Sequence, residues 1–226
     1  MASETKLRGN PRYSLAVITP VGPGHGDCAL NAQRSVLEAG LGDFESVEHI
    51  IVNDPKGELG RSKARNLGIE SATAEWLFFL DADDRMMPNA LSLNDFRSPA
   101  TFGAISLDGT IYDQNVYPCT FPDIAVRGAN GTLAMGFFCK RSIAERLKWN
   151  EDMDAGEDFE FYLRLPNFTK RPEPFVDIGY KHPSAHGPRG YGRIDWTAIC
   201  NREIREAIAH DPEKFDLPSD AVLAAT

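Results

Sequence analysis

The chain has 226 residues, of which 42% are hydrophobic and 25% are charged. Because one domain takes about 150 residues, this length and composition predict one large domain, or one domain with a small lobe, and exclude a disordered or fibrous chain. The 24 basic and 33 acidic residues give a net charge of −9, which argues against broad electrostatic capture of nucleic acid.

No apolar run approaches the roughly 18 residues that a membrane helix needs, and the polar N-terminal segment has no signal-like hydrophobic region. We therefore expect a cytoplasmic protein with no integral membrane contact. The cysteines are scattered without a close pair, at positions Cys28, Cys119, Cys139 and Cys200. This spacing favours buried free thiols over a disulfide scaffold or a zinc site.

The first half of the chain alternates between strand and helix patterns. Short apolar segments at 13–19, 47–52 and 75–80 predict strands, and 28–39 and 60–73 predict the helices between them. This alternation predicts an α/β fold with a mostly parallel central sheet flanked by helices. Ligands of such sheets bind beyond the carboxyl ends of the strands. The loops at those ends are 20–27, 53–60 and 81–88.

The second half has a different pattern. Asp108 and Gly109 lie between two apolar segments and predict a tight hairpin turn. Short helices are expected at 141–147 and 157–165, and apolar residues at helical spacing predict a packing helix over 195–209. The remaining C-terminal residues are expected to form a loosely ordered tail.

Three carboxylates follow the strand predicted at 75–80, namely Asp81, Asp83 and Asp84. In an extended segment Asp81 and Asp83 lie on one side, and two like charges about 4 Å apart repel by roughly 4 kcal/mol at an effective dielectric near 20. A divalent cation would turn this repulsion into attraction, and oxygen ligands suit Mg²⁺ or Mn²⁺. The alternative is a solvated acidic turn that caps the next helix.

Several motifs occur together in an order typical of one family. They are ARNLG at 64–68, DADD at 81–84, GED at 156–158 and YKHPS at 180–184. In this combination the chain resembles the inverting nucleotide-sugar glycosyltransferases of family 2, which have the GT-A fold. The resemblance covers residues 13–187 and is more specific than any one of the motifs.

The resemblance implies a Rossmann-like nucleotide-diphospho-sugar transferase fold with one catalytic domain over 1–210. Within it, 13–100 would form the nucleotide-binding half, 101–194 the acceptor and catalytic half, and 195–210 the packing helix. Residues 211–226 would be the tail.

For donor binding, the resemblance implies that Thr19, Pro20 and Val21 lie against the base and ribose. Asp54, or its neighbour Asn53, would accept the uracil imide hydrogen of a UDP-sugar. The alternative for Asp54 is a turn residue that precedes a proline.

The diphosphate would meet Arg65, and Lys63 beside it, at the start of the second predicted helix; an ordinary exposed helix face is the alternative, above all for Lys63. The resemblance also implies that Asp81 contacts the ribose or donor sugar and that Asp83 binds the Mn²⁺ or Mg²⁺ ion that bridges the diphosphate. The implied metal ligands are Asp83, Asp81 and His182, with His186 as the alternative to His182.

Sugar transfer needs a base near the acceptor hydroxyl. Asp158 is the candidate for this base, and Glu157 is its partner. On a helix the two side chains point about 100° apart, so they cannot perform the same task. The alternative is a pair of first-turn acids that stabilise a helix N-terminus.

These features predict a metal-dependent glycosyltransferase. The competing hypotheses are a nucleotidyltransferase of similar fold and a non-catalytic nucleotide-sugar-binding module. A haloacid-dehalogenase-type phosphohydrolase fits poorly, because Arg85 stands where that family has a threonine. The acceptor stays open among a glycan, a lipid-linked sugar, a protein and a modified nucleobase, and the oligomeric state is not predicted.

Overall fold

The computed structural model describes residues 13–92, 96–107, 109–112, 135–153, 155–165, 168–178 and 196–215. The strands are β1 (Tyr13–Val21), β2 (Phe44–Asn53), β3 (Trp76–Phe79), β4 (Arg85–Met86), β5 (Ala100–Leu107), β6 (Thr110–Tyr112), β7 (Phe137–Lys140) and β8 (Thr169–Asp177). The helices are α1 (Gly26–Ala39), α2 (Arg61–Ser71), α4 (Arg141–Leu147), α5 (Glu157–Leu163), α6 (Trp196–His210) and the short 3₁₀ helix η2 (Pro212–Phe215).

The strands form one mixed sheet in the order β2-β1-β3-β7-β5-β8-β4, with β6 paired to β5. The strands β2, β1, β3, β5 and β8 run in one direction, whereas β7, β4 and β6 run in the opposite one. The predicted α/β class with a mostly parallel sheet is therefore confirmed. The reversed strand β7, inserted beside β3, was not foreseen.

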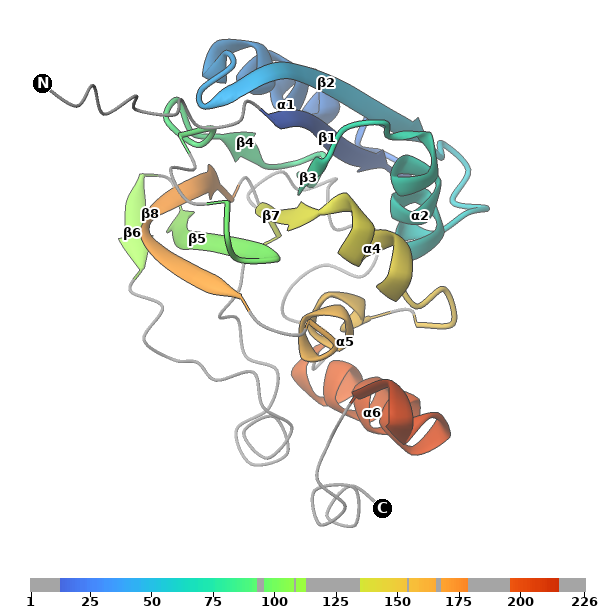
Figure 1. Ribbon diagram of the computed structural model, residues 1–226. Coiled ribbons are helices and arrows are strands. Elements are labelled where there is room, and N and C mark those ends of the chain that lie inside the picture. The colour runs from blue at the N-terminus through green and yellow to red at the C-terminus, as the bar shows by residue number, and fades with distance from the viewer. Residues whose placement is uncertain are drawn as a thin grey trace, which may run out of the picture.

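Both faces of the sheet are buried, because alternate residues of β1 enter two different clusters. Leu15 and Val17 pack with Val36 of α1. Ala16 and Ile18 instead join a cluster that includes residues of α2, α4 and α5. Figure 1 shows these three helices in succession beside the sheet, with α6 next to α5. This two-sided burial accounts for the continuous apolar character of β1 and β3.

The helix α2 packs unusually close to the sheet. A Cβ atom at Gly68 would lie 2.3 Å from Cγ2 of Ile18 in β1. The glycine of the ARNLG motif therefore allows this approach, which brings the start of α2 close to the carboxyl ends of the strands.

The helices and the hairpin of the second half agree with the sequence prediction, since α4, α5, α6 and the β5–β6 pair occupy the expected places. The strand β8 contains Pro172 and Pro174, which interrupt its pattern. Register shifts between β5 and β8 accommodate these prolines. Gly103 of β5 also leaves room for the backbone of β8, since a Cβ atom there would lie 2.7 Å from the backbone nitrogen of Phe175.

The C-terminal part of the described chain is better ordered than expected for a loose tail. Residues 212–215 form η2, and Phe215 is buried. Among the helices of the described ranges, none is long and apolar enough to cross a membrane.

Candidate functional site

The carboxyl ends of β1, β2 and β3 meet at one edge of the sheet. Val21 and Asn53 are paired in register at the ends of β1 and β2, and the backbone N–H of Leu80, just after β3, donates to the carbonyl of Ile18 at 3.0 Å. The loops after β1 and β2 also touch, because a Cβ atom at Gly57 would lie 3.2 Å from Cγ of Pro23. The three loops selected from the sequence therefore begin at the same edge.

Asp54 organises the loop that leads into α2. It is buried, its Oδ1 accepts the backbone N–H of Glu58 at 2.9 Å, and its Oδ2 accepts those of Leu59 and Gly60, both at 3.0 Å. These bonds are those of a turn residue, the alternative that the sequence left open. The neighbouring Asn53 is exposed, so it is the better placed of the two to meet a base.

Of the three residues expected along the base and ribose, Pro20 is half-buried, and Thr19 and Val21 are buried. The hydroxyl of Thr19 lies 2.9 Å from Nε2 of His49. Val21 packs in a small cluster with Ala29 and Ala82. A contact of Thr19 or Val21 with a ligand would thus involve the backbone rather than the side chain.

Arg65 of the ARNLG motif contacts both the DADD motif at 81–84 and the GED motif at 156–158. Its Nη2 donates to Oδ1 of Asp81 at 2.8 Å, and its Nη1 donates to Oε1 of Glu157 at 2.9 Å. Its guanidinium also lies over the ring of Trp149, 4.7 Å from the centroid. Arg65 is only 3% exposed, so this guanidinium holds carboxylates of the protein in place, and the expected contact with a diphosphate would require it to leave them.

Arg61 is a second cation at Glu157 and was not predicted from the sequence. Its Nη1 lies 3.6 Å from the same Oε1 that Arg65 bonds, and its side chain is 53% exposed. The Glu157 carboxylate raises the pKa of Arg61, in spite of partial burial. Burial alone would lower the pKa of Arg65, but Asp81 and Glu157 outweigh it and raise that pKa. Both guanidinium groups are therefore charged.

Glu157 and Asp158 have different environments, as their spacing on a helix predicted. Glu157 is buried and paired with arginine, whereas Asp158 is half-buried and accepts the backbone N–H of Phe159 at 2.8 Å. Burial, and next the Glu157 charge, raise the pKa of Asp158 to about 7, although Phe159 and the arginines Arg65 and Arg61 act against this shift. A carboxyl group with a pKa near neutral can exchange a proton at physiological pH.

Asp81 and Asp83 lie on the turn after β3. Asp81 is 33% exposed and Asp83 is half-buried. Within the described ranges, no group of three or more histidine, cysteine or acidic side chains is close enough together to hold a metal ion. Two carboxylates nevertheless fit Mg²⁺ or Mn²⁺, since Mg²⁺ is commonly bound by one or two carboxylates plus substrate phosphates. His182 and His186 lie outside the described residues.

The motifs at 64–68 and 149–158 are joined by Asn66, which the sequence placed in a motif but gave no role. Its Oδ1 accepts the backbone N–H of Trp149 at 2.8 Å, and its Nδ2 donates to the Trp149 carbonyl at 2.9 Å and to Glu151 at 2.8 Å. Trp149 in turn stacks on Phe161, with centroids 4.3 Å apart. The tryptophan that supports Arg65 is thus fixed from two sides.

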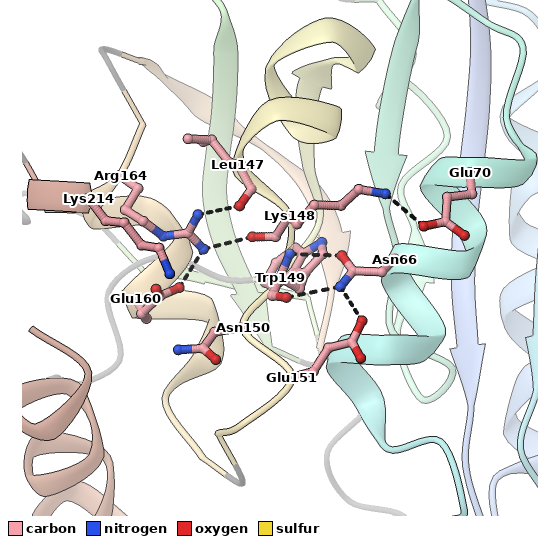
Figure 2. A pocket seen from close by; sticks show the side chains of 10 residues that line it. All are labelled: Asn66, Glu70, Leu147, Lys148, Trp149, Asn150, Glu151, Glu160, Arg164 and Lys214. Atoms are coloured by element: carbon pink, nitrogen blue, oxygen red, sulfur yellow. Dashed lines mark hydrogen bonds and ion pairs between the residues drawn. The ribbon is translucent and has the colours of Figure 1, made fainter. Parts of the chain in front are cut away.

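A pocket of about 350 Å³ lies beside this connection (Figure 2). It is lined by Asn66, Glu70, Leu147, Lys148, Trp149, Asn150, Glu151, Glu160, Arg164 and Lys214. Several of these groups are paired with each other, as Lys148 is with Glu70 at 2.9 Å and Arg164 with Glu160 at 2.6 Å. Among the site residues predicted from the sequence that the structure describes, none lines this pocket.

Comparisons with known proteins agree with the resemblance seen in the motifs. Residues 34–93 match the family described as Glycosyl transferase family 2. No curated protein sequence matches the chain.

Among solved structures, TarS 1–349 from S. aureus is similar over 94% of this chain and 70% of its own, with a TM-score of 0.61 and 14% identity. This TarS fragment also has structures in complex with UDP and with UDP-GlcNAc. The mannosyltransferase PcManGT from Pyrobaculum calidifontis, in complex with GDP-Man and Mn²⁺, is similar over 96% of this chain and 74% of its own, with a TM-score of 0.55 and 14% identity.

Glucosyl-3-phosphoglycerate synthase from Mycobacterium tuberculosis, in complex with Mn²⁺, UDP-Glc and phosphoglyceric acid, gives a TM-score of 0.55 at 11% identity, over 92% of this chain and 81% of its own. These likenesses concern the fold, and the match over residues 34–93 concerns the sequence. The structural likenesses show a fold of the GT-A type, and the sequence match to Glycosyl transferase family 2 covers residues 34–93.

Proposed function

We propose that this chain is a glycosyltransferase that moves a sugar from a nucleoside diphosphate donor, a UDP-sugar, to an acceptor hydroxyl with inversion at the anomeric carbon. The observation that carries the proposal is the difference between two adjacent carboxylates. Glu157 is held by Arg65 at 2.9 Å, whereas Asp158 is half-buried and has its pKa raised to about 7 by burial and by Glu157.

In this reaction Asp158 removes the proton of the acceptor hydroxyl while the acceptor oxygen bonds to the anomeric carbon. The bond from that carbon to the diphosphate oxygen breaks, and the nucleoside diphosphate leaves. A base with a pKa near neutral is partly unprotonated at physiological pH and receives a proton readily. Arg65 acts by holding Glu157 and the carboxylate of Asp81 at fixed places.

Asp83 and Asp81 would hold a Mn²⁺ or Mg²⁺ ion together with the donor diphosphate, and His182 remains the proposed third ligand. The ion would supply charge stabilisation for the departing diphosphate. PcManGT and the mycobacterial synthase are both recorded with Mn²⁺, which supports metal dependence for this chain.

The choice of uridine rests on two supports. TarS 1–349 binds UDP and UDP-GlcNAc, and Asn53 is exposed at the end of β2, where the resemblance expects a base contact. Because PcManGT binds GDP-Man, guanosine donors are the comparison that a donor screen must include.

The test is a screen for release of nucleoside diphosphate from UDP- and GDP-sugars, with Mn²⁺ and with candidate acceptors of each class. The proposal expects release that requires both metal and acceptor. Asp158→Asn should keep donor binding and lose transfer, whereas Asp152→Asn, on an exposed residue of the preceding loop, should be as active as the wild type. Donor binding without turnover on any acceptor would instead support the binding module, and release of pyrophosphate from a nucleoside triphosphate would support the nucleotidyltransferase.

A further inference from the structure

The arginine of the ARNLG motif is poorly placed to bind a ligand. Both terminal nitrogens of Arg65 are bonded to carboxylates, and its plane rests on Trp149. Its side chain is 3% exposed. Turning this guanidinium toward a donor would leave Glu157, which is itself buried, without its closest cation, and an unpaired buried charge is strongly unfavourable.

Arg61 differs from Arg65 on each of these points. It is the first residue of α2, one helical turn before Arg65, and its side chain is 53% exposed. Its distance of 3.6 Å to Oε1 of Glu157 is that of an ion pair longer than a hydrogen bond. Arg61 can therefore leave Glu157 at small cost, because Arg65 continues to neutralise the same carboxylate.

The acidic side chains around Arg61 outnumber the arginines beside them. The network contains Asp81, Glu157 and Asp158 against Arg61 and Arg65, and all three carboxylates act on the pKa of Arg61. A nucleoside diphosphate brings additional negative charge to a chain whose net charge is already −9. Guanidinium groups suit phosphate because they donate two parallel hydrogen bonds.

We propose that Arg61, rather than Arg65, is the arginine that binds the diphosphate of the donor, moving from Glu157 to the phosphate oxygens when the donor enters. This inference rests on the proposed function, because it requires a nucleoside diphosphate at the edge formed by β1, β2 and β3. It assigns Arg65 the separate role of positioning Asp81 and Glu157.

The test compares binding of UDP, UMP and uridine, and of GDP, GMP and guanosine, to the full chain with Mn²⁺ by calorimetry. Arg61→Gln should weaken diphosphate binding about 10- to 100-fold, as expected for loss of a charge-assisted hydrogen bond, and should leave nucleoside binding unchanged. Arg61→Lys should lose less, because it keeps the charge. The matched control is Arg202→Gln on α6, since Arg202 is also exposed (63%) and lies 3.9 Å from its partner Glu206.

The outcomes separate the two proposals. If the wild type binds UDP or GDP and Arg61→Gln binds it within twofold of the wild type, the assignment of Arg61 is wrong while the proposed function stands. Equal losses for the nucleoside and the diphosphate would also overturn it, since they indicate a general disturbance of the site. If the wild type binds neither diphosphate, the proposed function itself fails, and this inference fails with it.

Discussion

The side chain of Asn66 bonds both backbone groups of Trp149, which lies 83 residues further along the chain. This pair of hydrogen bonds attaches the loop before α5 to α2. Because Trp149 also supports the guanidinium of Arg65, the same contact connects the stability of the fold to the geometry of the candidate site.

Asn66→Ala should therefore lower the free energy of unfolding by about 2–4 kcal/mol, because it leaves a buried N–H and a buried carbonyl without partners. Denaturant unfolding followed by tryptophan fluorescence measures this. The control is Glu151→Ala, which removes one bond at an exposed side chain and should cost less than about 1 kcal/mol. Equal effects of the two variants would show that the Trp149 contact does not stabilise the fold.

The raised pKa of Asp158 predicts a pH-dependent stability difference between the wild type and Asp158→Asn. The folded-state pKa of about 7 lies above the unfolded value of about 3.9, so the folded chain binds this proton more tightly. The contribution of Asp158 to stability is then fully present below pH 4 and is lost as the pH rises to about 7.

Asp158→Asn keeps an acceptor for the Phe159 N–H and cannot ionise. It should match the wild type near pH 4 and exceed its free energy of unfolding by about 2–4 kcal/mol at pH 8. Urea titrations of both proteins at several pH values measure the difference. A difference that does not change between pH 4 and pH 8 would show that the carboxyl titrates in the same range folded and unfolded.

Asp83→Asn should abolish the metal dependence of donor binding, because it removes one of the two carboxylates proposed to hold the ion. Titration of UDP with and without Mn²⁺ measures this. Chelation of the metal should reduce wild-type binding to the level of the variant. The control is Asp43→Asn, on an exposed residue before β2, which should keep the full response to Mn²⁺. A variant at Asp83 that still binds UDP more tightly with Mn²⁺ would contradict the proposed metal site.

Gly68→Ala tests the close approach of α2 to β1. A Cβ atom there would lie 2.3 Å from Ile18, so the helix must shift, and we expect a loss of about 1–3 kcal/mol in unfolding free energy. Gly26→Ala is the matched control, since no atom lies within 4 Å of a Cβ at that first residue of α1. It should be neutral or stabilising by up to about 1 kcal/mol. Thermal unfolding of both variants decides the point.

The elements of the first half, and the motifs that follow them, could be predicted from local sequence patterns alone. The alternation of apolar segments and helical spacing located β1, β2 and β3 with the helices between them, because such patterns arise from neighbours within a few residues. The reversed strand β7 is only four residues long, and β8 contains two prolines, so neither has a clear local pattern.

The contacts of each site residue, in contrast, depend on how the folded chain packs. Arg65 meets Asp81, 16 residues away, and Glu157, 92 residues away, and it does so because the packing of α2 and α5 on the same face of the sheet brings them together. The adjacent residues Glu157 and Asp158 differ for the same reason, since Glu157 pairs with the arginines and Asp158 accepts the backbone N–H of Phe159. The local sequence shows which site residues are charged. Their partners and their burial depend on contacts that only the folded chain creates.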